Sequence, residues 1–154
     1  MIHYLVDVSW LLYRGHHSCS KIWSEYPEIH FLCKKLESLL SRKDARIALV
    51  LEGYDVKGKH LCENYKAGRH QEGSYNVYSG LYSFIKLLNN ERISVYYNKC
   101  YESDEIIYTL SKTLDGRKKI ISGDKDLFQS LSKDVVIDNG NNFIITEESY
   151  KYDY

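Results

Sequence analysis

Short apolar runs that alternate with stretches of helical periodicity constrain the fold of this chain more than any other feature of its sequence. Four runs have the length and β-branched content of buried strands, and they cover residues 1–8, 46–51, 93–97 and 119–121. Helical spacing of apolar residues is found between or after these runs, at residues 10–13, 27–42, 75–90, 102–114 and 124–132. Strands that alternate with helices predict an α/β fold with a mainly parallel β-sheet and helices on both faces.

The end of the chain carries a strong turn signal. Asn139-Gly140 lies between two further apolar runs, at 135–138 and 143–145, and this dipeptide is typical of a tight β-hairpin. Thr146-Glu147-Glu148 then indicates the start of a last helix. With 154 residues, no repeats and no internal linker, the sequence predicts a single domain over residues 1–154.

The composition argues against several classes of protein. The formal net charge is zero, so any surface that binds nucleic acid has to be a local basic one. No apolar run is long enough to span a membrane, and no charged N-terminal segment precedes a long apolar one, so we expect a cytoplasmic protein with no membrane partner. The four cysteines are far apart and form no CxxC pair, so a structural zinc site is not expected.

Acidic residues follow the predicted strands at the point where each strand ends. Asp124 and Asp126 come directly after the run at 119–121, across the turn at Ser122-Gly123. Because the carboxyl ends of parallel strands meet at one edge of a sheet, we expect these two acids to share that edge with the acids that follow the other strands. Those further acids are Asp7, Glu52, Glu102, Asp104 and Glu105.

These acids can be interpreted in two ways. A single acid at a strand end is usually a helix cap, and an isolated Asp-x-Asp turn is usually a cap beside a solvated second Asp. At least six acids from four strand ends are hard to explain as caps, because their charges repel unless cations lie among them. Oxygen ligands suit Mg²⁺ or Mn²⁺, and two such ions roughly 4 Å apart can hydrolyse a phosphodiester. The sequence therefore predicts a site for Mg²⁺ (or Mn²⁺), with two ions.

A basic stretch comes directly after Glu52. Its members are Lys57, Lys59, Lys66, Arg69 and His70. A solvated helix face is the ordinary explanation of such a run. In a chain of zero net charge it is also the plausible docking surface for nucleic acid, and Lys66 and Arg69 lie three residues apart, on one helical face. Tyr65 offers a stacking surface for an unpaired base, and Arg14 is expected to contact nucleic acid or an acid of the site.

Five stretches of the chain, in order, resemble the 5′-nuclease superfamily, which comprises flap endonucleases, phage 5′-exonucleases and the N-terminal nuclease domain of bacterial DNA polymerase I. The stretches are Val6-Asp7 with Leu12-Tyr13-Arg14, Leu49–Glu52, Tyr65–Arg69, Tyr101–Glu105 and Ser122–Leu127. The resemblance covers nearly the whole chain, with similar gaps between the stretches, and the last three stretches are together quite specific. The resemblance implies a PIN-like fold and Mg²⁺-dependent hydrolysis of DNA phosphodiesters near 5′ ends, flaps or single-stranded branches, with 5′→3′ polarity.

The resemblance also implies roles for individual residues. The implied metal ligands are Asp7, Glu52, Glu102, Asp104, Glu105, Asp124 and Asp126. The implied catalytic residues are Lys66, Arg69, Asp7, Asp104 and Asp124, with Lys66 and Arg69 contacting the phosphate. Together with the basic stretch, this makes the expected nucleic-acid contacts Arg14, Lys57, Lys59, Tyr65, Lys66 and Arg69.

The sequence departs from the family's pattern in two places. The family usually has Asp where this chain has Glu52, so Asp55 is a rival ligand, and the second acid of the family's Asp-Asp pair is Glu105 here. The family also continues after the hairpin into a helix-three-turn-helix domain that grips duplex DNA, and we expect this chain to lack it. A fragment, a minimal nuclease, or half of a split enzyme with a partner subunit for duplex binding would each fit that expectation.

Two other functions remain open from the sequence. One is a stand-alone PIN-like ribonuclease that acts on single-stranded RNA, because the sheet and the acids would be the same. The other is a catalytically weak module that docks on a replication protein, an interpretation that the full set of acids makes less attractive. Cleavage of matched DNA and RNA substrates separates these functions.

Overall fold

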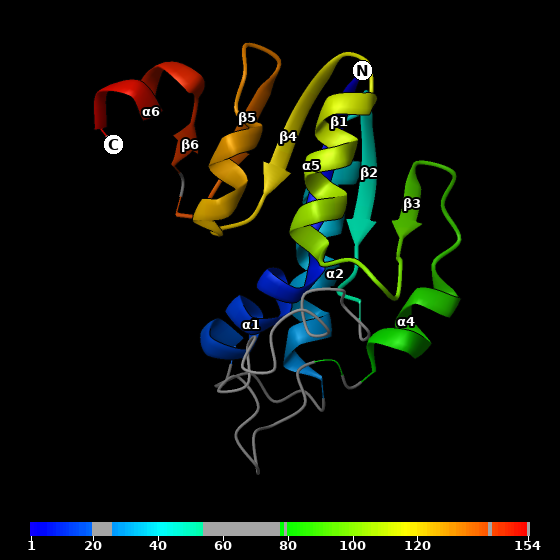
Figure 1. The fold of residues 1–154 in the computed structure, drawn as a ribbon. Coiled ribbons are helices and arrows are strands. Elements are labelled where there is room, and N and C mark those ends of the chain that lie inside the picture. The colour runs from blue at the N-terminus through cyan, green and yellow to red at the C-terminus, as the bar shows by residue number, and fades with distance from the viewer. Residues whose placement is uncertain (20–25, 54–77, 79, 142, 154) are drawn as a thin grey trace.

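A computed structural model describes residues 1–19, 26–53, 78, 80–141 and 143–153 of the chain (Figure 1). Six strands form one sheet in the order β3-β2-β1-β4-β5-β6. Every neighbouring pair is parallel except β5 and β6, which form the C-terminal hairpin. The strands are β1 (Ile2–Asp7), β2 (Ala45–Val50), β3 (Ile93–Tyr96), β4 (Arg117–Ile121), β5 (Val135–Asp138) and β6 (Ile144–Ile145). The predicted mainly parallel sheet with a C-terminal hairpin is thus confirmed.

Helices cover both faces of the sheet, as the alternation of strands and helices predicts. Neighbouring residues of a strand point to opposite faces, so Val6 packs in one buried cluster and Leu5 in the other. The first cluster includes residues of α1 (Val8–Cys19), α2 (Pro27–Leu40) and α4 (Leu81–Leu87). The second includes residues of α5 (Ser103–Thr113) and of the 3₁₀ helix η2 (Lys125–Ser130). Figure 1 shows α5 in front of the sheet and α2 behind it. A last helix, α6 (Glu147–Asp153), follows the hairpin.

Two predicted helices differ from the structure. Within the stretch predicted as one helix over 75–90, α4 begins only at Leu81, because Gly80 has a left-handed φ of 80°. The segment predicted as an α-helix over 124–132 is the 3₁₀ helix η2. Its buried residues, Leu127 and Ser130, are three apart, and this spacing aligns them on one side of a 3₁₀ helix. The predicted basic helix at 57–69 lies outside the described residues.

The register of the sheet brings the carboxyl ends of its central strands level. Asp7 at the end of β1 pairs with Val50 of β2, and Val6 pairs with Ile121 of β4. The residues that follow these strands therefore leave the sheet at one edge. Figure 1 shows the arrowheads of β2 and β4 at the same end of the sheet, which is also the end where α5 begins.

Candidate metal centre

Three carboxylates from two segments of the chain converge at this edge. Asp104 lies in the first turn of α5, whereas Asp124 and Asp126 lie at the turn from β4 into η2. Each offers one oxygen, and the three oxygens lie within 4.8 Å of one another. Asp104 is half-buried and the other two are exposed. Ligand oxygens about 2.0–2.6 Å from a Mg²⁺, Mn²⁺ or Ca²⁺ ion have mutual separations in this range, so these three residues can hold one hard divalent cation.

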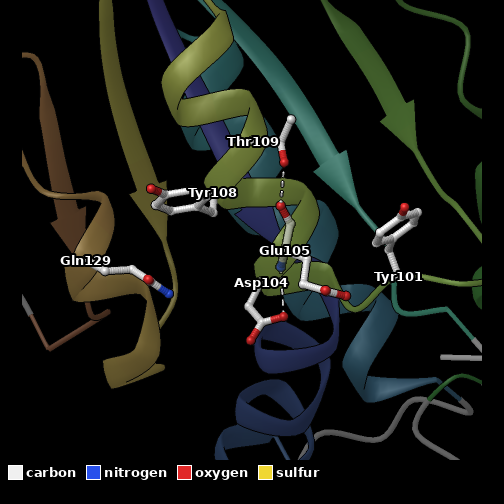
Figure 2. Close-up of a pocket in the computed structure, with 6 residues that line it drawn as sticks. All are labelled: Tyr101, Asp104, Glu105, Tyr108, Thr109 and Gln129. Carbon is white, nitrogen blue, oxygen red and sulfur yellow. Dashed lines mark hydrogen bonds between the residues drawn. The ribbon is translucent and has the colours of Figure 1, made fainter. Parts of the chain in front are cut away.

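Several of these acids also accept hydrogen bonds from backbone amides at the starts of α5 and η2. Asp124 accepts a hydrogen bond from the backbone N of Asp126 at 2.9 Å. At the start of α5, Glu105 accepts a hydrogen bond from the backbone N of Glu102 at 2.8 Å. Asp104 accepts one from the backbone N of Glu105 at 2.7 Å (Figure 2). A helix N-terminus favours negative charge, so these contacts lower the cost of gathering the acids. The capping interpretation and the metal interpretation therefore apply to the same side chains.

Asp7 is the buried acid of this edge, with only 5% of its surface exposed. Its two oxygens accept hydrogen bonds from the Ser122 hydroxyl at 2.8 Å and from the backbone N of Trp10 at 3.2 Å. The pKa of Asp7 is raised to about 6, mainly by burial and also by the charges of Glu52 and Asp124, which together outweigh the lowering effect of the two hydrogen bonds. A nearby cation would stabilise the charged form of Asp7 and so offset the effects of burial and of the neighbouring charges. The position of Asp7 therefore suits a metal centre.

Glu52 connects the end of β2 to the first turn of α5. Its Oε2 accepts a hydrogen bond from the Ser103 hydroxyl at 2.9 Å and a longer one, 3.4 Å, from the Ser103 backbone N. Ser103 is buried and lies directly between Glu102 and Asp104. The contact holds the α5 acids against the carboxyl end of β2.

Gly53 is needed for this connection because the backbone of the next loop passes directly over it. Its N donates to the carbonyl of Tyr101 at 3.1 Å, and a Cβ at this position would lie 2.4 Å from that oxygen and 2.6 Å from the carbonyl oxygen of Asn98. Both obstructing atoms belong to the backbone, so the loop would have to move.

We therefore expect Gly53→Ala to lower the free energy of unfolding by about 1–3 kcal/mol, the usual cost of overpacking. Chemical denaturation measures this. Gly116→Ala is a useful comparison because the nearest atom to its added Cβ is 3.9 Å away, an ordinary contact, so its cost arises from a φ of 82° alone. A Gly53→Ala protein as stable as the parent would show that the loop yields freely.

All seven predicted metal ligands lie at the strand-end edge or in the first turn of α5, but they are not equivalent. Only Asp104, Asp124 and Asp126 form the close group of three within the described residues. Asp7 is electrostatically coupled to Asp124 and Glu52, Glu52 contacts Ser103, and Glu102 is the buried N-terminal cap residue of α5. Asp55, the rival of Glu52, lies outside the described residues.

Two serines that the sequence interpretation left without a role organise this edge. Ser122 is fully buried; its hydroxyl donates to Asp7 and accepts from the backbone N of Asp124 at 3.2 Å. Ser103 donates to Glu52. Their roles could have been predicted from their positions directly before or among the acids, because a buried carboxylate needs a hydrogen-bond donor beside it.

The predicted nucleic-acid contacts are only partly covered by the structure. Lys57, Lys59, Tyr65, Lys66 and Arg69 lie outside the described residues, and their roles stay predictions. Arg14 donates from Nη2 to the carbonyl oxygen of Gly140 at 2.7 Å and to Asn141 at 3.0 Å, and its guanidinium lies 5.3 Å from the Trp10 ring centroid. Arg14 thus joins α1 to the hairpin turn, and its predicted contact with nucleic acid remains untested. No helix in the described part of the chain is long and apolar enough to cross a membrane.

A mainly parallel sheet with helices on both faces, and with carboxylates gathered where its strands end, defines a PIN-like α/β domain. The chain belongs to the family described as 5′-3′ exonuclease, N-terminal resolvase-like domain, which matches residues 3–154. This confirms the resemblance to the 5′-nuclease superfamily.

Two solved structures share this fold. One is a T5 protein co-crystallized with metal ions, with a TM-score of 0.64 and 15% identity, and the other is T5 5′-exonuclease with divalent zinc bound, with a TM-score of 0.67 and 16% identity. In both comparisons 99% of this chain is covered, and it spans 60% of the solved chain. No curated protein matches the sequence.

Proposed function

We propose that this chain is the nuclease domain of a divalent-metal-dependent enzyme that hydrolyses DNA phosphodiesters at 5′ ends and flaps. The observation that carries the proposal is the convergence of Asp104, Asp124 and Asp126 at the strand-end edge of a domain from the 5′-3′ exonuclease family. The two similar T5 structures were solved with metal ions, which supports the use of a divalent cation by this fold.

We propose that this edge binds two cations. Asp104, Asp124 and Asp126 would hold one, and Asp7, Glu52, Glu102 and Glu105 supply the oxygens from which ligands for a second would come. Bound divalent cations would supply a water of lowered pKa and neutralise charge on the leaving oxygen of the phosphodiester.

The chain's own residues would keep these carboxylates in place and prepare them for a cation. The Ser122 hydroxyl and the Trp10 amide fix the orientation of Asp7, and Ser103 fixes Glu52. Burial of Asp7 keeps bulk water from solvating its charge, which raises its preference for a cation. Lys66 and Arg69 are proposed to neutralise the scissile phosphate.

Cleavage assays test the substrate and the metal together. We expect the chain to cut a 5′-flap DNA and a single-stranded 5′ end in Mg²⁺ or Mn²⁺, to cut matched single-stranded RNA much less, and to lose activity in EDTA. Asp115→Asn is the matched control, because Asp115 is exposed and comes just before β4, at the opposite edge of the sheet. Cutting that is unaffected by EDTA would contradict the metal role, and preference for RNA would favour the ribonuclease function.

Metal binding should also stabilise the fold, independently of cleavage. A cation present at about 100 times its dissociation constant stabilises the folded state by about 2.7 kcal/mol. We therefore expect Mn²⁺ to raise the melting temperature of the parent protein, and Asp104→Asn to remove most of the increase while leaving the melting temperature in EDTA nearly unchanged. If Mn²⁺ raised the melting temperature of Asp104→Asn as much as that of the parent, the cation would bind somewhere other than at Asp104.

A further inference from the structure

A groove beside the metal centre suggests how this domain holds its substrate strand. It has a volume of about 280 Å³ and is lined by Tyr101, Asp104, Glu105, Tyr108, Thr109 and Gln129 (Figure 2). It runs over the outer side of α5 towards η2, and Tyr108 and Gln129 line its η2 side. Asp104 belongs both to the groove and to the group of three carboxylates, so the groove is continuous with the candidate metal centre.

The residues of α5 change character with distance from the metal centre. Asp104, Tyr108 and Lys112 follow one another at intervals of four residues, which places them in one row along the helix. Tyr108 is 38% exposed, and the Lys112 ammonium lies 5.2 Å from the centroid of its ring. Moving away from the acids, the row therefore offers first an aromatic face and then a cation.

This order matches the chemistry of a nucleic-acid strand better than that of an acidic or apolar ligand. Asp104 and Glu105 repel any anion that is not accompanied by a cation, whereas a neutral base can lie beside them. Tyr108 offers a face for stacking, the Gln129 amide can donate to and accept from a base edge, and Lys112 attracts a phosphate. At 1.5 Å per residue, Asp104 and Lys112 are separated by about 12 Å along the helix axis, a span that a few nucleotides cover at roughly 3.4 Å each when stacked.

We propose that the groove is a nucleotide subsite, in which Tyr108 stacks an unpaired base of the strand held at the metal centre and Lys112 binds a phosphate farther along that strand. This inference rests on the proposed function. It adds that the single-stranded part of the substrate lies along the outer side of α5, and it makes Tyr108 a positioning residue.

Substitution of Tyr108 combined with a modified substrate tests the stacking. We expect Tyr108→Ala to raise KM for single-stranded or flap DNA roughly 5- to 150-fold, the range expected for loss of one base stack, and Tyr108→Phe to stay close to the parent. The kcat and the Mn²⁺-induced rise in melting temperature should change little, because Tyr108 holds no metal. A series of oligonucleotides can carry one abasic position that is moved stepwise away from the cut site. At one position the missing base should raise KM for the parent protein but should not raise the KM of Tyr108→Ala any further, because that variant has already lost the stack.

The control exploits a second tyrosine–lysine pair of the same spacing. Tyr82 is 72% exposed on α4, and Lys86 lies 4.3 Å from its ring centroid. Tyr82 does not line the groove, whereas Tyr108 does and carries Lys112 beside its ring. Tyr82→Ala should therefore leave KM unchanged. Fluorescence anisotropy in Ca²⁺ measures how the affinity for DNA falls as the salt concentration rises. Lys112→Gln should reduce the slope of log affinity against log salt concentration by about 1, the value for one lost phosphate contact, and Lys86→Gln should leave the slope unchanged.

The outcomes separate the two proposals. A parent protein that cleaves DNA while Tyr108→Ala has the same KM and the same abasic profile overturns the subsite and leaves the nuclease function standing. A parent protein that neither binds nor cleaves DNA in any divalent metal overturns both.

Discussion

Replacing Asp124 and Asp126 together with Asn is expected to reduce DNA cleavage by about 10³-fold or more, because the metal's contribution of several kcal/mol corresponds to a factor of ten for every 1.36 kcal/mol. Asn has the shape of Asp, and its side-chain oxygen can still accept the hydrogen bond that Asp124 takes from the backbone N of Asp126 at 2.9 Å. The turn into η2 should therefore keep its structure while the group of three carboxylates loses two charges.

Single-turnover cleavage of a 5′-flap DNA, with circular dichroism as the check on folding, measures this effect. Asp115→Asn is again the control, as an exposed acid at the opposite edge of the sheet. Cleavage within a few-fold of the parent by a folded double variant would remove these two residues from the chemistry and, with them, the assignment of the metal centre.

Asp7→Asn is expected to stabilise the metal-free protein at neutral pH. The pKa of Asp7 rises from 3.8 to about 6 on folding, mainly because of burial, so the folded state binds a proton more tightly than the unfolded state. The stability linked to this proton is complete below about pH 4 and is lost as the pH rises through about 6. At pH 8 the parent protein has lost about 3 kcal/mol of stability, because the pKa of this carboxyl differs by about two between the folded and unfolded states. Asn carries no titratable proton, so the variant does not lose this stability. Asn can also keep both hydrogen-bond positions, one with the Trp10 amide and one with the Ser122 hydroxyl.

Urea denaturation in EDTA at several pH values measures this difference. The stability gain of Asp7→Asn over the parent should be small near pH 4, grow up to about pH 6–7 and then level off, and Mn²⁺ should shrink it by stabilising the parent more. Under the same conditions a pH-independent gain, or a loss at pH 8, would contradict the assigned cause.

Asp138→Asn provides the opposite case. Burial raises the pKa of Asp138, but the Gly140 amide and the ammonium groups of Lys35 and Lys119 outweigh it, and the net pKa is lowered. Lys119 lies 3.3 Å and Lys35 3.7 Å from its Oδ2. Its contribution to stability is therefore present at neutral pH and is lost as the pH falls through the lowered pKa. Asp138→Asn should accordingly destabilise the protein at pH 7, where Asp7→Asn stabilises it.

Much of the fold could be predicted from the sequence because local patterns specify individual elements. The apolar run of Arg46–Leu51, the turn at Asn139-Gly140 and the proline at the start of α2 each act over a few residues, and the structure has a strand, a hairpin and a helix start at these places. The helices at 75–90 and 124–132 were less predictable. Apolar spacing does not distinguish a 3₁₀ helix from an α-helix over six residues, and it does not show that Gly80 adopts a left-handed φ.

The alternating elements and the acid after each strand could be predicted from the chain alone, because side-chain periodicity and turn residues act locally. The strand order, which brings β4 beside β1, became known only from the folded structure. The same holds for the three acids that lie close enough to share a cation. The folded structure also showed that Ser122 and Ser103 hold the neighbouring carboxylates and that α5 presents a groove beside them. Distances between residues far apart in the chain depend on how the sheet is assembled, and side-chain spacing along a sequence does not carry that information.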